Sequence, residues 1–166
     1  MKARGTLARL EALEAAGRER VAAVEAVKED TAMWAAERLS PADRAALFEH
    51  LDAEETGGPW WAEVCRASCA LDGPPLEDPV GAAARAWGEA TGGTPDGVPY
   101  PLPPPGAAAY FEREAARCDT VKKGASGEVL PEGVSVEAAQ TAARWSAAWW
   151  RYEAAFAAQL LDAVKT

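Results

Sequence analysis

The part of the sequence that most constrains the fold lies in its middle, where proline and glycine dominate the run GGTPDGVPYPLPPPG between Gly92 and Gly106. Proline lacks a backbone N–H and clashes with the preceding helical turn, so this run can form neither a helix nor a central strand. On either side, residues 2–39 and 136–164 are rich in alanine and carry apolar residues at helical spacing. The pattern predicts helical regions joined by an irregular connector over residues 92–106.

Helix-capping signals divide the remaining sequence. Ser40, Asp78 and Ser135 each precede a helical apolar pattern, and the first two are followed by a proline suited to the first helical turn. The expected helices span residues 40–55, 60–71, 78–92, 107–119 and 135–164. The first of them is expected to bury three large apolar residues: Leu47, Phe48 and Leu51.

The predicted fold class is all-α, with roughly six helices in one compact domain. A chain of 166 residues is long enough for one domain with its own core, and no convincing strand pattern of period two occurs. Gly17 falls where the apolar spacing of the first helical region changes register, so we expect a break or a kink there. The domain would then comprise residues 17–166, and residues 1–16 would form an N-terminal helical arm. We expect this arm to pack against another chain or to stay mobile rather than to join the core. Its apolar edge consists of Leu7, Leu10 and Leu13.

The formal net charge of −9 restricts the classes of partner. Nucleic acids are bound mainly through Lys and Arg, so nucleic acid is not expected as the main partner, whereas a basic protein surface is compatible with this charge. No apolar run approaches the ~20 residues of a membrane span, and the N-terminal residues lack the apolar core of a signal peptide. We expect a cytoplasmic location with reduced thiols. The sequence also has the general character of small helical proteins of phage particles, although it shares no motif with them. In that case the protein would be located in the virion.

Residue types used in catalysis are scarce. The chain contains one His and three Cys, and it lacks the Walker, G-x-S-x-G and G-x-G-x-x-G motifs. We therefore favour a non-catalytic role without a cofactor. The leading hypothesis is a helical protein that acts through protein contacts or self-association, as an assembly factor, an accessory subunit or a structural component.

A small metal- or thiol-dependent protein is the first alternative. Tetrahedral zinc accepts thiolate and imidazole ligands. The chain offers four such side chains: His50, Cys65, Cys69 and Cys118. Cys65 and Cys69 are four apart and so lie on one helix face, but structural zinc sites more often carry a C-x2-C knuckle, and buried cysteine behaves as a small hydrophobe. We expect metal-free thiols, with at least Cys65 buried.

The last helix is the strongest candidate for a binding surface. Trp, Tyr and Arg dominate the energetic hot spots of protein interfaces. The candidate partner-binding residues on this helix are Arg144, Trp145, Trp149, Trp150 and Arg151. Adjacent helical residues point about 100° apart, so one of Trp149 and Trp150 is expected to enter the core while the other is exposed. The alternative is a wide apolar stripe that faces only the core.

Two further hypotheses concern aromatic and proline-rich segments. A pocket near Trp145 and Trp149 would make the protein a helical binder of an apolar ligand. The proline-rich run over residues 99–105 favours a polyproline II conformation, which suits an aromatic groove on a partner. The alternative for this run is a stiff connector that lies over the domain's own aromatic residues.

Overall fold

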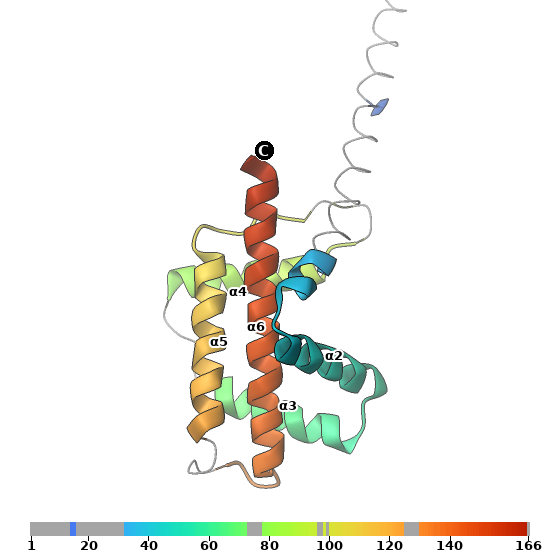
Figure 1. Cartoon of the computed structure of the whole chain (residues 1–166), viewed down its shortest axis with the longest axis vertical. Coiled ribbons are helices and arrows are strands. Elements are labelled where there is room, and N and C mark those ends of the chain that lie inside the picture. The colour runs from blue at the N-terminus through green and yellow to red at the C-terminus, as the bar shows by residue number, and fades with distance from the viewer. Residues whose placement is uncertain are drawn as a thin grey trace, which may run out of the picture.

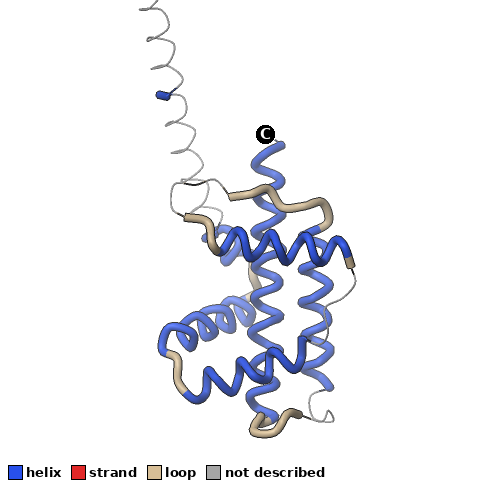
Figure 2. Tube along the Cα trace, turned by 180° about the vertical axis from the view of Figure 1, so that it is seen from behind, coloured by secondary structure: helices blue, strands red, loops and turns tan. Residues whose placement is uncertain are grey.

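In the residues that the computed structural model describes, all regular structure is α-helical (Figures 1 and 2), which confirms the predicted fold class. The described ranges are 14–15, 32–72, 78–95, 98, 100–124 and 130–165. After a helical segment over residues 32–38 come α2 (Pro41–Thr56), α3 (Pro59–Asp72), α4 (Pro79–Gly92), α5 (Ala107–Gly124) and α6 (Val136–Lys165). The predicted arm and its Leu7, Leu10 and Leu13 lie outside the described residues, apart from Glu14 and Ala15.

The 30-residue helix α6 is the centre of the molecule, because α5, α3 and α2 all pack against it. Figure 1 shows α5 beside α6 and running in the opposite direction, whereas α2 lies on the other side of α6. In Figure 2, α4 and α3 cross the α5–α6 pair at two different levels. No described helix combines the length and the apolarity needed to cross a membrane.

The predicted caps are present at the starts of three helices. Ser40 Oγ accepts from the backbone N–H of Asp43 at 3.1 Å, and Asp78 Oδ1 accepts from that of Val80 at 3.0 Å. Ser135 Oγ likewise accepts from the N–H of Ala138 at 3.1 Å. Each bond satisfies a backbone donor that has no partner within its own helix, so local sequence sets these helix starts.

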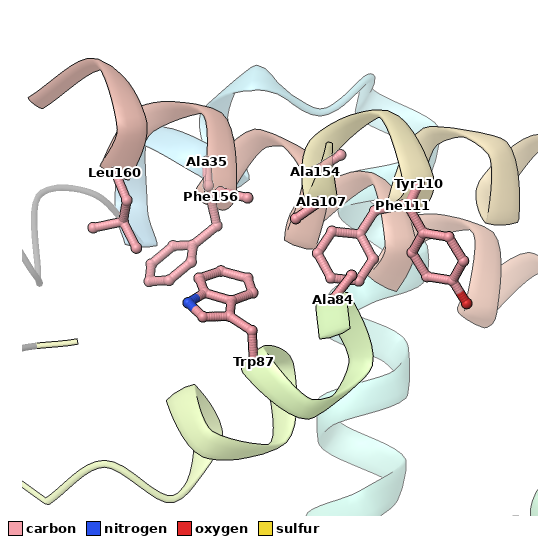
Figure 3. Close-up of a cluster of buried hydrophobic side chains, with 10 residues drawn as sticks. Ala35, Ala84, Trp87, Ala107, Tyr110, Phe111, Ala154, Phe156 and Leu160 are labelled. Carbon is pink, nitrogen blue, oxygen red and sulfur yellow. The ribbon is translucent and has the colours of Figure 1, made fainter. Parts of the chain in front are cut away.

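The core consists of two clusters along α6, both rich in alanine. One cluster holds Trp87, Phe111 and Phe156 from α4, α5 and α6, as Figure 3 shows. The other is formed by Leu47 of α2, Val64 of α3 and Trp145 of α6, together with alanines of α6. The small alanine side chains allow the helices to approach closely where they touch. Large aromatic rings fill the wider spaces between the helices.

The central connector lies over the domain's own aromatic residues. Trp87 Nε1 donates to the carbonyl of Pro101 at 2.6 Å, and the Pro103 side chain is buried. Tyr100 meets Phe156 edge to face, with ring centroids 5.3 Å apart. These contacts fit the connector interpretation of the proline-rich run rather than that of a free polyproline ligand.

Two details of the predicted helices are wrong. Within α2, Leu47 is buried, but Phe48 and Leu51 are exposed. Phe48 points about 100° away from its neighbour Leu47 and so faces away from the core. Leu51 shares the face of Leu47, but it lies one turn further along α2, which runs outward from α6 (Figure 1). In addition, α5 continues past Asp119 to Gly124, since neither glycine nor proline interrupts the chain before Gly124.

Candidate functional site

A cavity of about 190 Å³ lies between α2, α3 and α6, and we call it the His50 pocket. Helical periodicity builds its walls, because residues three or four apart share a helix face. It is lined by His50 of α2, by Trp61, Val64, Cys65, Ser68 and Cys69 of α3, and by Ala142, Trp145 and Ser146 of α6. The sequence hypothesis of a cavity near Trp145 thus corresponds to a pocket with a largely apolar wall.

The imidazole of His50 is surrounded by indole rings. Its centroid lies 5.4 Å from that of Trp61 and 5.5 Å from that of Trp145, both in edge-on geometry. Trp149 stacks against it, with centroids 5.8 Å apart and planes 20° from parallel. Burial lowers the pKa of His50 below 6.5 and outweighs the opposite effect of Glu54. His50 is therefore a neutral imidazole at neutral pH, with one donor and one acceptor nitrogen.

Two nitrogens of this pocket's residues lack hydrogen-bond partners. They are His50 Nδ1 and Trp145 Nε1, and both atoms are buried within the described part of the chain. Leaving a buried polar group unpaired costs about 1–3 kcal/mol. A small molecule with one hydrogen-bonding atom could pair with such a nitrogen. Ligand pockets commonly combine an apolar wall with a few polar groups of this kind.

The four candidate ligands of the alternative metal-site hypothesis do not all line one pocket. His50, Cys65 and Cys69 line one pocket, but Cys118 of α5 is not among its lining residues. Among the described residues, no three His, Cys, Asp or Glu side chains are placed to hold a metal ion. Cys65 is only half-buried, which corrects the prediction that it would be buried, because α3 presents it at the pocket wall rather than in the core.

The prediction for the tryptophans of α6 is also wrong. Trp145 is 2% exposed and belongs to the core, so it cannot contact a partner in this fold. Trp149 and Trp150 are both half-buried instead of one being buried and the other exposed. Their different directions lead them to different neighbours: Trp150 stacks on Phe111 of α5 at 5.6 Å, and Trp149 stacks on His50 of α2. Helices on both sides of α6 thus cover both rings.

The two predicted partner-binding arginines form ion pairs within the chain. Arg144, which is half-exposed, pairs with Glu49 of α2 at 2.9 Å. Arg151 pairs with Asp43 of α2 at 2.8 Å and also with Asp119 of α5. Arg151 therefore connects α6 to the helices on both of its sides, and this position leaves it little freedom to bind a partner.

One notable residue escaped the sequence analysis, namely Glu153. It lies on α6 four residues after Trp149, and its buried Oε2 has no hydrogen-bond partner among the described residues. Burial raises the pKa of Glu153 to about 7. The sequence contained a signal for this residue, because a single acidic residue interrupts the aromatic stripe between Trp149 and Phe156.

Comparison of the chain with protein-family models, curated proteins and solved structures gives no match.

Proposed function

We propose that the protein is a non-catalytic binder of a small apolar ligand, held in the His50 pocket. The observation that carries this proposal is an apolar cavity whose wall includes His50 and Trp145, each with an unpaired buried nitrogen. This corresponds to one of the three hypotheses from the sequence, that of a helical protein with an aromatic-lined pocket.

The size of the pocket limits the ligand. Its volume is about 190 Å³, whereas an engineered apolar cavity of about 150 Å³ binds benzene. The expected ligand is therefore one aromatic ring or an aliphatic group of similar size. A single hydroxyl or carbonyl oxygen on it would reach His50 Nδ1 or Trp145 Nε1 through a small shift of the ring, because both nitrogens are buried.

The pKa of the Cys65 thiol favours a binding role for the pocket over a catalytic one. Burial and the neighbouring Cys69 raise the pKa of the Cys65 thiol. A nucleophilic cysteine needs the opposite change, because the thiolate is the reactive form. Cys65 is therefore suited to forming part of a binding wall rather than to nucleophilic attack.

Phenol and toluene make a matched pair of probes, since they differ mainly in one hydroxyl group. Titration followed by the indole N–H signals in ¹H–¹⁵N NMR spectra should show saturable binding that shifts the Trp145 signal. Phenol should bind about ten-fold more tightly, because a hydrogen bond contributes about 1 kcal/mol or more. Equal affinity for the two probes would show that the ligand hydroxyl forms no stabilising hydrogen bond in the pocket.

A pair of α3 variants locates the binding. Ser68→Leu places a larger side chain in the pocket and should weaken phenol binding at least ten-fold. Ala70→Leu adds the same side chain at an exposed position of the same helix and should leave binding unchanged. The proposal fails if phenol does not bind at millimolar concentration or if Ser68→Leu binds it as well as the unaltered protein does.

A second candidate function is contact with a basic protein. Phe48 and Leu51 are 52% and 39% exposed and lie three residues apart, so they form one apolar patch on α2. On the same helix lie three further exposed acidic residues, Asp52, Glu54 and Glu55, besides Glu49, which already pairs with Arg144. Because the whole chain carries a charge of −9, a basic partner with an apolar surface suits this patch better than a second copy does.

Two designed amphipathic helical peptides test this candidate, one with Leu and Lys and the other with Leu and Glu. The basic peptide should bind, and Phe48→Ser should weaken its binding at least five-fold. Met33→Ser, at another exposed apolar position, is the control and should have no effect. The candidate is excluded if the two peptides bind equally or if Phe48→Ser leaves the affinity of the basic peptide unchanged.

A further inference from the structure

A second cavity, of about 340 Å³, lies between α4, α5 and α6, and we call it the Glu153 pocket. Its volume is within the usual range of small-molecule sites. It is lined by Arg85, Gly88 and Glu89 of α4, by Phe111 of α5, and by Trp149, Trp150 and Glu153 of α6. It shares no lining residue with the His50 pocket, although its Trp149 stacks on His50.

Aromatic rings form one part of this pocket. Trp150 and Phe111 stack nearly parallel, with centroids 5.6 Å apart and planes 13° from parallel. Trp149 contributes a third ring. The face of an indole carries negative electrostatic potential and attracts cations within about 6 Å. The rings therefore offer a surface that suits an organic cation.

The charged groups favour the same class of ligand. Glu153 has a buried carboxyl oxygen without a hydrogen-bond partner. The guanidinium of Arg85 is 3.5 Å from the buried carboxylate of Glu114, and its Nε donates to the hydroxyl of Tyr110 at 2.5 Å. Glu114 also pairs with Arg117 at 3.1 Å, so it is shared by two guanidinium groups. The lining of the pocket itself has two acidic side chains, Glu153 and the exposed Glu89, against the one guanidinium of Arg85.

We propose that the Glu153 pocket binds a small organic cation of the alkylammonium class, with the ammonium group between the Glu153 carboxylate and the indole rings. The carboxylate would neutralise the ligand's charge, and the rings would replace part of its hydration. This proposal is independent of ligand binding in the His50 pocket.

Choline and its neutral carbon analogue 3,3-dimethyl-1-butanol are suitable probes, because they have nearly the same shape and differ in charge. Isothermal titration calorimetry of the full chain at pH 8 keeps Glu153 ionised, since its pKa is about 7. Choline should bind at least ten-fold more tightly than the neutral analogue. A titration with sodium chloride at the same concentration measures the effect of ionic strength alone.

Three variants separate this site from the rest of the molecule. Glu153→Gln keeps the shape of the side chain and should weaken choline binding at least ten-fold without changing the affinity for the neutral analogue. Glu137→Gln, at an exposed position of α6, should bind choline normally. Ser68→Leu, which fills the other pocket, should also bind choline normally, so failure of one proposal is distinguishable from failure of the other.

Thermal unfolding of each variant before titration establishes that it is folded. The proposal is overturned if choline and the neutral analogue bind with the same affinity, if neither binds at millimolar concentration, or if folded Glu153→Gln binds choline as tightly as the unaltered protein does.

Discussion

His50 of α2 stacks on Trp149 of α6, with ring centroids 5.8 Å apart, and Trp149 also lines the Glu153 pocket. One indole therefore contacts the side chains of both proposed sites. Trp149→Ala should destabilise the fold by about 2–4 kcal/mol, because it removes a half-buried ring from between two helices. It should also shift the NMR signals of His50. Urea unfolding measures the stability, and Trp149→Phe should retain most of it; an alanine variant as stable as the unaltered protein would contradict this role.

The half-buried Trp150 gives a parallel prediction. It stacks on Phe111 and belongs to the cluster that also holds Trp87, so Trp150→Ala should cost about 2–4 kcal/mol as well. Urea unfolding measures this loss. A Trp150→Ala variant that unfolds at the same urea concentration as the unaltered protein would contradict the prediction.

Replacing Glu153 should change how stability depends on pH. Burial raises its pKa from 4.5 to about 7, so between these values the unfolded chain loses the proton while the folded protein keeps it. Stability therefore falls as pH rises through this window. Glu153→Gln should stabilise the protein at pH 8 by up to about 3 kcal/mol, and much less at pH 4. Urea unfolding at both pH values measures the difference; equal effects would exclude a buried carboxyl as the cause.

His50 should produce the opposite trend. Because burial lowers its pKa, the unfolded chain binds a proton before the folded protein does as pH falls below 6.5. Stability is consequently lost with decreasing pH in this range. In a Glu153→Gln background, which removes the competing carboxyl, His50→Gln should flatten the remaining dependence between pH 7 and pH 5. An unchanged slope in that double variant would show that another group is responsible.

Arg151 should contribute more to stability than Arg144. Arg151 pairs with carboxylates on two helices and is the less exposed of the two arginines. Arg151→Met should cost about 1–2 kcal/mol, since it leaves Asp43 and Asp119 without their shared partner, whereas Arg144→Met should cost less than about 1 kcal/mol. Thermal unfolding at low and high salt measures both, and a larger loss for Arg144→Met would refute this ranking.

Several features could be predicted from local sequence. The caps at Ser40, Asp78 and Ser135 form hydrogen bonds to backbone N–H groups within three residues, so they depend on nothing distant in the chain. The all-α class and the helix starts follow from these caps together with helical apolar spacing. The interruption over residues 92–106 likewise follows from the restrictions that proline places on its own backbone.

The surroundings of each side chain depended on tertiary structure. Periodicity places Leu47 and Phe48 on different faces of α2 but does not say which of the two faces α6 and α3 cover. In the same way, the sequence names His50 but not the three indoles around it, because they come from α3 and α6. A helical pattern specifies which residues share a face, whereas the helix that covers that face is chosen by packing between segments far apart in the chain.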